Sequence, residues 1–478
     1  MEQATKTPQQ LTAQFQTNVK LLDDILGVSR NYDISGRELR IGGRRAHLYF
    51  LDGYGKDDVI ERILAFLLSL TEQQLGSVKD MDDFASRFGT YGETGTEQDL
   101  DTIVTSILLG KCALLLEGME RAMLFDAKAY PTRGVEEPSD GKVLRGSHDG
   151  FTEVVKKNSA LIRRRIRDPR LVMENHRVGE RSQADVVLCY LDDKVDREAL
   201  GEIRERLNKI DVYSISMGQE SIAEAIHRPQ WFNPFPRVRY TERPDAAAAS
   251  VMEGSIILMV DNSPSVMILP TSFFDFMQET NDYYFPPLVG TYLRLVRFFV
   301  FLASLVITPV WYLAMMNPEH IPSWLAFIGI EEPNGVPLLL QLLLLELIVD
   351  LLKLASLNTP DVLSNSFSML GALILGDFAV RANWLVPEVL VYIAFVAIAS
   401  FAQPSFELGY AFKLMRVLLL ILSALFSIWG FLGGLVLMAV LIATTKPLAG
   451  HYLYPIYPFN WKALKHLLLR QPISRDNT

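Results

Sequence analysis

The spacing of hydrophobic and polar positions divides the chain into two parts. Before about residue 290, short apolar runs alternate with stretches of helical period, which is typical of an α/β protein. After that point, apolar segments of near-membrane length follow one another at 295–316, 337–353, 366–385, 387–402 and 416–445. The pattern predicts an α/β soluble region followed by an all-α polytopic membrane domain.

The first part repeats one order of elements. Strands are predicted at 46–51, 112–118 and 121–127, and again at 185–193, 255–261 and 265–271, with helices between the first and second of each set. Gly110 precedes Glu117 by seven residues and Gly254 precedes Asp261 by seven, each at the start of a predicted hairpin. We therefore expect two similar α/β subdomains, with residues 46–126 superposing on 185–270.

Changes in composition suggest boundaries within this plan. Prolines and glycines concentrate in the stretch 129–150, which marks irregular chain between the two repeats. The expected organisation is a polar N-terminal segment, subdomain 1, a linker with a connecting helix, subdomain 2, the membrane domain and an interfacial C-terminal tail, at residues 1–30, 31–130, 131–170, 171–285, 286–446 and 447–478.

Charge is distributed very unevenly. Residues 295–478 carry 10 basic and 10 acidic side chains, so the remaining 36 of 46 basic and 45 of 55 acidic residues, and with them the whole net charge of −9, lie in residues 1–294. An acidic soluble region argues against a nucleic-acid partner. The first residues, MEQATKTPQQLTAQ, lack the basic and apolar regions of a secretory signal, so we expect the soluble region on the cytoplasmic side.

The segment 337–353, PLLLQLLLLELIVDLLK, is the most informative apolar stretch. Its charged residues Glu346, Asp350 and Lys353 fall on one stripe of a helix, while leucines cover the rest. A carboxylate facing lipid is costly, so such residues usually face a bundle interior or a water-filled path. We predict that these three residues line a pore. The alternatives are an amphipathic helix on a soluble core or at the membrane interface, or an Asp350–Lys353 pair packed against a neighbouring span.

Two further features concern the membrane region. Asp377 and Arg381 are four apart on one helix face, so we expect a structural ion pair within a span. The segment 416–445 is long enough to tilt, or to bend at Gly430, Gly433 and Gly434. The apolar segments allow four or five spans, and the basic residues do not decide between them. With five spans the basic tail lies outside, and with four spans Lys413 and Arg416 lie outside, so the positive-inside rule is broken in both; both termini inside is the favoured arrangement.

Motifs of catalysis and cofactor binding do not occur in the sequence. It contains no P-loop, HExxH, GxSxG or GxGxxG motif, and its seven histidines show no pair at ligand spacing. The two cysteines, Cys112 and Cys189, lie in apolar runs and are expected to be buried in strands. The sequence therefore predicts neither an enzyme nor a bound metal or cofactor.

The block 231–245, WFNPFPRVRYTERPD, combines a rigid backbone with a ladder of charges. It serves either as a connection between strands or as a docking surface and relay towards the membrane. The residues singled out are Pro234, Pro236, Arg239, Glu242, Arg243, Pro244 and Asp245.

This block resembles the GerA family of spore germination receptor A subunits, as do 136–153, 158–171, 178–186, 264–284 and the helix with Glu346 and Asp350. The likeness is to the stage V sporulation branch in particular, because the linker reads RGSHDG where receptor subunits more often have a proline after RG. It extends over nearly the whole chain from about residue 30.

The resemblance implies a protein of the spore inner membrane, with its N-terminal region on the core side. It also implies a homo-oligomer, a pentamer in the family, that conducts ions during germination. The implied partners are membrane lipids and either a small membrane protein or the receptor subunits B and C. A secondary transporter and a membrane-anchored scaffold are the alternatives to a channel subunit.

Overall fold

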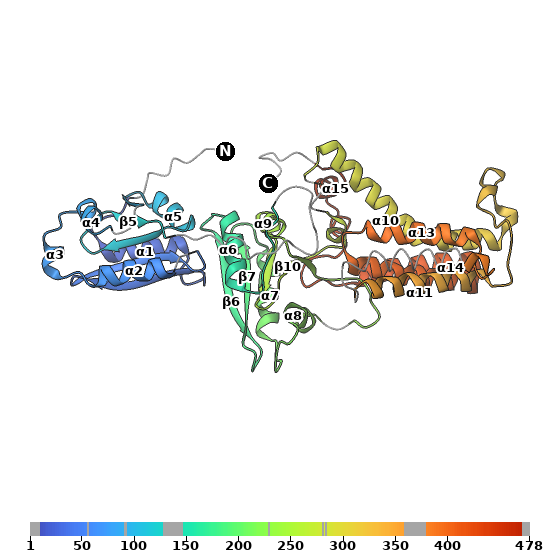
Figure 1. Ribbon diagram of the computed structural model, residues 1–478, viewed down its shortest axis with the longest axis horizontal. Helices are drawn as coiled ribbons and strands as arrows, with labels where there is room; N and C mark the ends of the chain where they lie inside the picture. The colour runs from blue at the N-terminus through green and yellow to red at the C-terminus, as the bar shows by residue number, and fades with distance from the viewer. Residues whose placement is uncertain are drawn as a thin grey trace.

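The computed structural model describes residues 10–54, 57–89, 93–127, 147–227, 230–279, 282, 284–357 and 379–470. Two α/β subdomains and a helical domain follow one another along the long axis of the molecule (Figure 1). Each subdomain contains one antiparallel five-stranded sheet. The predicted fold class, two similar α/β subdomains followed by a helical part, is confirmed.

Subdomain 1 has helices on both faces of its sheet, whose strand order is β1-β2-β4-β5-β3. In β4, Ala113 and Leu115 pack against α1 and α5, while Leu114 and Leu116 face the side of α2 and α4. Burial on both faces explains why β4 reads as a continuous apolar run. The elements are α1 (Phe15–Leu26), β1 (Ile34–Ile41), β2 (Arg44–Leu51), α2 (Asp57–Leu68), α3 (Glu72–Gly76), α4 (Met81–Phe88), β3 (Thr94–Glu97), α5 (Leu100–Leu108), β4 (Cys112–Leu116) and β5 (Ala122–Phe125).

Subdomain 2 repeats this topology strand for strand, with the order β6-β7-β9-β10-β8. Its helices α6 and α9 cover one face and α7 and α8 the other. Cys112 and Cys189 are both buried in strands, as expected. The elements are α6 (Val155–Arg165), β6 (Leu171–Val178), β7 (Ala184–Leu191), α7 (Arg197–Asn208), α8 (Gln219–Ile226), β8 (Arg239–Thr241), α9 (Pro244–Met252), β9 (Ile256–Val260) and β10 (Val266–Leu269).

The same two side-chain–backbone hydrogen bonds occur at equivalent positions of the two subdomains, which supports the duplication at the level of single residues. The Asn18 side chain accepts from the Thr12 N–H at 3.1 Å and donates to the Thr12 carbonyl at 2.6 Å. Asn158 makes the same two bonds with Thr152, at 2.8 and 2.6 Å. In each subdomain these bonds fix the backbone just before the helix, α1 or α6. The two helices therefore occupy equivalent positions in the two subdomains.

The two subdomains are joined by a buried ion pair. The Arg163 guanidinium on α6 contacts both carboxylate oxygens of Asp33, at 2.8 and 2.9 Å, and donates to the Leu171 carbonyl at 3.0 Å. Asn31 accepts a hydrogen bond from the Met173 N–H at 2.7 Å. Arg163 is only 1 % exposed, so the joint is closed to solvent.

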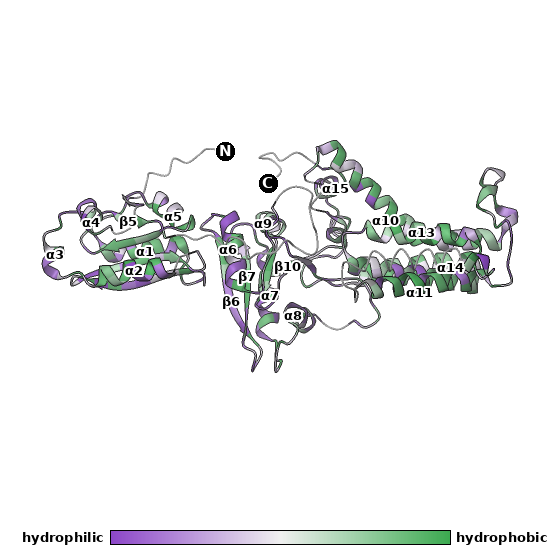
Figure 2. Ribbon diagram, viewed as in Figure 1, coloured by the Kyte–Doolittle hydropathy of each residue, from purple (hydrophilic) through white to green (hydrophobic). Residues whose placement is uncertain are grey.

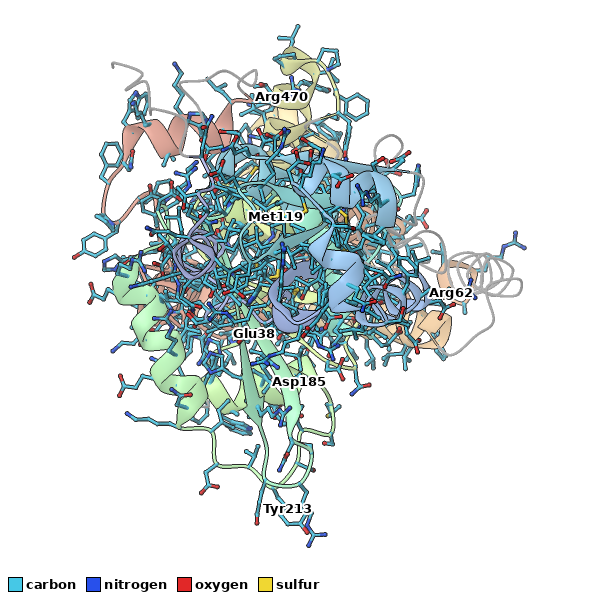
Figure 3. All side chains as sticks on the ribbon, turned by 90° about the vertical axis from the view of Figure 1, so that its left-hand side faces the viewer. Glu38, Arg62, Met119, Asp185, Tyr213 and Arg470 are labelled. Carbon is cyan, nitrogen blue, oxygen red and sulfur yellow. The ribbon has the colours of Figure 1, made fainter. Side chains whose placement is uncertain are left out.

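Subdomain 2 also carries a projection away from its core. In the loop before α8, the carbonyls of Val212 and Tyr213 accept from the N–H groups of Glu180 and Arg181 in the β6–β7 turn, at 3.0 and 2.9 Å. The Arg181 guanidinium lies 4.7 Å from the centre of the Tyr213 ring. Viewed along the long axis, Tyr213 is at the tip of this projection, and Asp185, near the start of β7, lies closer to the body of the subdomain (Figure 3).

The helical domain is strongly apolar along the helices labelled α10, α11, α13 and α14 (Figure 2). The 3-10 helix η1 precedes it. By length and composition, α10 and α14 could each cross a membrane. Its described elements, with η1, are η1 (Phe273–Met277), α10 (Pro287–Met316), η3 (Pro318–His320), η4 (Ser323–Ile328), α11 (Leu338–Leu357), α13 (Pro387–Phe401), α14 (Phe406–Thr444) and α15 (Trp461–Leu468).

The structure corrects the expected course of the last apolar segment. It does not bend at Gly430 but reverses direction at Ser427, whose φ of 53° and ψ of −137° are not helical. A β-carbon on Gly434 would lie 2.6 Å from Leu419 Cδ2, although 15 residues of continuous helix would separate the two by about 22 Å. α14 is therefore a hairpin of two antiparallel arms, and Gly430 and Gly434 allow the arms to approach closely.

The hairpin returns the chain to subdomain 2. After the second arm, Thr445 Oγ1 accepts from Asn233 Nδ2 at 2.6 Å, and the Tyr452 hydroxyl donates to the Pro236 carbonyl at 2.7 Å. Leu448 belongs to the hydrophobic core of subdomain 2. Residues 445–470 thus lie at the same end of the helical domain as the α/β subdomains.

Candidate functional site

The helix that carries the predicted pore residues is anchored at its start. The Gln341 amide donates to Asn334 Oδ1 at 2.8 Å and to the Val336 carbonyl at 2.9 Å, and it accepts from the Val386 N–H at 2.8 Å. These bonds satisfy a buried polar side chain and tie the first turn of α11 to the start of α13. Leucines dominate the rest of α11, so its charged residues need partners on other helices.

Glu346 has such a partner on the first arm of α14. Its two carboxylate oxygens accept from Arg416 Nε and Nη2 at 2.7 and 2.9 Å, and Arg416 Nη1 donates to the Ser304 carbonyl of α10 at 3.1 Å. Glu346 is 5 % exposed. A buried pair of this geometry is costly to break, because the remaining charge is left unpaired at about 3–5 kcal/mol.

Asp350 and Lys413 extend the cluster towards the surface. Lys413 Nζ forms an ion pair with Asp350, donates to the Glu346 carbonyl at 2.9 Å, and lies 3.6 Å from Glu346 Oε2. The side chain of Asp350 is 30 % exposed, whereas that of Lys413 is 13 % exposed. Asp350 thus pairs with α14 and lies at the outer edge of the group.

Lys353 completes the cluster on the side of α13. Its ammonium donates to Ser400 Oγ at 2.9 Å and lies 5.4 and 5.6 Å from the ring centres of Phe401 and Tyr410. Ammonium groups are attracted to aromatic faces at such distances. The structure therefore brings together all three residues predicted to line a pore, but adds two basic residues to them.

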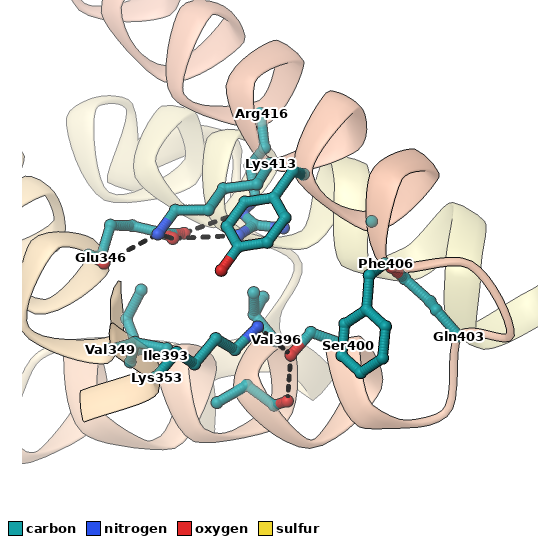
Figure 4. Close-up of a pocket in the computed structure, with 13 residues that line it drawn as sticks. Glu346, Val349, Lys353, Ile393, Val396, Ser400, Gln403, Phe406, Lys413 and Arg416 are labelled. Atoms are coloured by element: carbon teal, nitrogen blue, oxygen red, sulfur yellow. Dashed lines mark hydrogen bonds and ion pairs between the residues drawn. The ribbon is translucent and has the colours of Figure 1, made fainter. Parts of the chain in front are cut away.

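Four of the five charged side chains border a small internal space, and Asp350 lies outside it (Figure 4). The cavity has a volume of about 30 Å³, room for one or two water molecules. Glu346, Lys353, Lys413 and Arg416 line it, together with Ser400, Gln403 and Tyr410. Two carboxylates and three cations make up the cluster, so this arrangement can exchange charged partners. Within the described residues, no three His, Cys, Asp or Glu side chains are placed to hold a metal ion.

The other predicted pair cannot be assessed in the same way. Asp377 lies outside the described residues, and Arg381 is helical and exposed, just before the turn that leads to α13.

The block 231–245 lies at the junction between subdomain 2 and the helical domain. Phe235 packs within 6.4 Å of Phe273 and 6.2 Å of Phe412, measured between ring centres, and so bridges η1 and α14. Pro236 accepts the Tyr452 hydrogen bond, and Arg239 lies in β8. The position fits the predicted connection as well as the predicted relay.

The end of the same block is held by an ion pair. Arg243 contacts the carboxylate of Asp245 at 2.6 Å, and the Tyr284 hydroxyl donates to it at 3.0 Å. Burial raises the pKa of Asp245, but these two partners outweigh it and hold the pKa below its usual value. Pro244 opens α9, and the Glu242 carbonyl accepts from the Phe151 N–H at 2.8 Å.

A second buried cluster closes the junction. Asp282 is fully buried and contacts Arg297 at 2.8 and 3.0 Å and Arg294 at 3.3 Å. Arg294 Nη1 also donates to the His466 carbonyl of α15 at 2.9 Å. The start of α10 and the C-terminal helix are thereby fixed to one another.

Analysis of the sequence did not identify Lys413 and Arg416 as members of the site. Helical periodicity relates residues on one helix, and these two are about 70 positions away from Glu346 on another. One signal in the sequence could have identified them: Lys413 and Arg416, three positions apart, interrupt an apolar stretch. Because buried charges need partners of opposite sign, they could have been paired with the two acidic residues of α11.

Comparison with known proteins identifies the family. The family model described as Bacillus/Clostridium GerA spore germination protein matches residues 20–478. The chain belongs to the GerA family. Stage V sporulation protein AF of Bacillus subtilis (strain 168) is 37% identical over 453 residues, covering 95% of this chain and 92% of that protein.

Other relatives agree with this assignment. Spore germination protein KA of the same organism is 29% identical, covering 94% of this chain and 83% of that protein. The higher identity with the stage V protein agrees with the predicted branch. The crystal structure of the N-terminal domain of the A subunit of the Bacillus megaterium spore germinant receptor GerK3 aligns with a TM-score of 0.43 and 24% identity, covering 56% of this chain and 99% of that one.

Proposed function

We propose that this GerA-family protein is a multi-pass protein of the spore inner membrane, with its α/β subdomains on the core side, and that its oligomer conducts cations during germination. The observation that carries the proposal is the charged cluster in the middle of otherwise apolar helices. Charged residues inside membrane segments are rare and mark ion pathways or relays. The long apolar helix α10, the apolar hairpin α14 and a relative named as the membrane protein YfkQ of Bacillus subtilis (strain 168) support a membrane location.

The surface of α11 supports an assembly around this helix. Its exposed leucines follow the spacing of a helix–helix contact: Leu340, Leu344, Leu347, Leu351 and Leu354. Asp350 lies beside this stripe with part of its side chain exposed. When several copies share an axis, one Asp350 per copy forms an acidic ring, which attracts cations and repels anions.

The three predicted pore residues have different roles in this proposal. Asp350 lies at the conducting path, Lys353 borders the internal cavity on the side of α13, and Glu346 keeps Arg416 and the first arm of α14 in place. The oligomer is a homo-oligomer, a pentamer by analogy with the family. The proposed partners are membrane lipids and either a small membrane protein or the B and C subunits of germination receptors.

Ion flux in liposomes that contain the purified protein tests the proposal. We expect K⁺ permeability above that of empty liposomes, and a cation-to-anion permeability ratio that falls in the double variant Glu346→Gln, Asp350→Asn. A membrane-anchored scaffold would produce no flux. A secondary transporter would show saturable exchange, without a current that follows the ion gradient.

A further inference from the structure

The ammonium of Lys413 occupies a site formed by two acidic residues of another helix. It forms an ion pair with Asp350, lies 3.6 Å from the Glu346 carboxylate, and donates to the Glu346 carbonyl at 2.9 Å. Two carboxylates and a carbonyl oxygen are oxygen ligands of the kind that hard monovalent cations also prefer. The site that holds the ammonium is therefore chemically suited to a free cation.

Lys413 is not needed to neutralise Glu346. Arg416 already contacts both oxygens of that carboxylate, at 2.7 and 2.9 Å. Asp350 has no such fork: within the part of the chain that the structure describes, Lys413 is the cation paired with it. Lys413 therefore mainly neutralises Asp350, the partly exposed acidic residue that lies at the proposed conducting path.

The two basic residues also differ in how firmly they are held. The planar guanidinium of Arg416 is fixed on two helices, through Glu346 on α11 and the Ser304 carbonyl on α10. Lys413 has a flexible four-carbon stem and a point charge, which can leave one geometry for another at low cost. It borders the internal cavity of about 30 Å³, which gives the head group a space into which it can move.

We propose that Lys413 is a tethered cation that occupies the Asp350 site and blocks it, and that a permeant monovalent cation binds there only when the lysine moves away. An ammonium group and K⁺ have the same charge and similar size, so they compete for the same oxygens. The proposal rests on the cation conduction proposed above, and it adds the residue that regulates the site.

Lys413→Met tests this with two independent readouts on the full-length protein. In detergent, KCl should raise the Tm of the variant by about 2–4 °C relative to the same concentration of the bulky cation N-methyl-D-glucamine, because K⁺ replaces the missing ammonium. The wild type should show no such difference. In liposomes, the variant should conduct K⁺ several-fold faster than the wild type. Lys446→Met, at an exposed lysine outside the cluster, is the matched control and should behave like the wild type in both assays.

The two readouts separate this inference from the proposed function. A K⁺-specific rise in Tm without flux in any protein would support the tethered cation and overturn conduction. Flux in the wild type that Lys413→Met does not increase, with no K⁺-specific change in Tm, would overturn the tethered cation and leave conduction standing. Loss of the K⁺ effect on Tm in Lys413→Met, Asp350→Asn is expected; its persistence would place the ion elsewhere and overturn the inference.

Chemical restoration covers the case in which Lys413→Met folds poorly. Lys413→Cys can be treated with aminoethyl methanethiosulfonate, which restores an ammonium, or with the neutral methyl reagent. Cys112 and Cys189 are buried in strands, so position 413 is the preferred target. We expect the charged reagent, but not the neutral one, to lower the K⁺ flux to the wild-type level. Equal flux after both treatments would contradict the block.

Discussion

Two buried arginine–carboxylate pairs in this protein have nearly the same geometry but different surroundings. Arg163 and Asp33, between the α/β subdomains, are joined at 2.8 and 2.9 Å; Arg416 and Glu346, in the helical domain, at 2.7 and 2.9 Å. The first pair is completed by uncharged groups of the backbone and of Asn31. The second lies beside Asp350 and two lysines, next to a cavity.

This difference suggests a structural role for the Arg163–Asp33 pair, and we propose a functional role for the cluster around Arg416 and Glu346. In the first pair, the other hydrogen-bonding groups of the arginine are satisfied by a carbonyl and an amide. Such a pair has one stable arrangement and fixes the two subdomains relative to one another. In the second cluster, Lys413 contacts both Glu346 and Asp350, and Arg416 also contacts Glu346. We therefore propose that this cluster can bind or release an ion, and we place function at Glu346 and Asp350 and not at Asp33.

The joint between the subdomains should show the largest effect on stability. Arg163→Met leaves the Asp33 carboxylate buried without its partner, and should reduce the free energy of unfolding by about 3–5 kcal/mol. Thermal or denaturant unfolding of the purified protein measures this. The double variant Arg163→Met, Asp33→Leu should recover part of the loss. A single variant as stable as the wild type would show that water reaches the joint.

The pair in the helical domain should be somewhat more tolerant. Arg416→Met removes the main partner of Glu346, but Lys413 lies 3.6 Å from the same carboxylate and can move closer. We expect a loss smaller than at Arg163, below the roughly 3–5 kcal/mol of a buried charge left with no partner. The yield and Tm of the protein in detergent provide the comparison. An effect larger than that of Arg163→Met would contradict the idea that this cluster can rearrange.

A partly exposed network in subdomain 2 gives a pH-dependent intermediate case. Burial raises the pKa of Glu174, but the nearby His176 ring and hydrogen bonds from Arg204 and Tyr190 lower it to about 2. Because the folded-state pKa is depressed, the stabilisation is present above about pH 4.5 and is lost as the pH falls towards 2. After allowance for solvent screening, we expect about 1–2 kcal/mol. Unfolding of Glu174→Gln from pH 6 to 3 should lack this part of the pH dependence; an unchanged pH profile would argue against it.

An exposed pair across the same joint as Arg163 should show the smallest effect. Lys156 and Asp52 are 2.8 Å apart, but both side chains are more than a third exposed. Lys156→Ala should change the free energy of unfolding by less than about 1 kcal/mol. A loss comparable to that of Arg163→Met would mean that exposed ion pairs hold the two subdomains together as strongly as the buried pair does.

The sequence was sufficient to predict the buried strands but not the outer ones. β4 and β9 are apolar on both faces, so they read as continuous hydrophobic runs. β1 and β6 lie at the sheet edges and carry exposed polar residues, as in ISGRELRI, and β3 and β8 are too short for a periodic signal. The strand order, and hence the full extent of the duplication, required the structure.

For the site, the sequence predicted the charged face of α11 but not the basic residues of α14 that pair with it. The stripe of Glu346, Asp350 and Lys353 follows from helical period alone. That Lys413 and Arg416 face it depends on how α14 packs, and on the reversal at Ser427, a residue type that rarely adopts a positive φ. In the sequence, two basic residues in an apolar segment indicate only a membrane topology; the structure explains them instead by ion pairs with Glu346 and Asp350.

The most direct test of the account is the ion selectivity of Asp350→Asn in liposomes, measured as the reversal potential in a KCl gradient. Asp350 is partly exposed, so this variant should assemble normally, and Glu38→Gln on β1 is a control of equal charge change far from the cluster. We predict that the cation-to-anion permeability ratio falls in Asp350→Asn and stays at the wild-type value in Glu38→Gln. An unchanged ratio in a well-assembled Asp350→Asn protein would contradict the claim that this cluster is where cations pass.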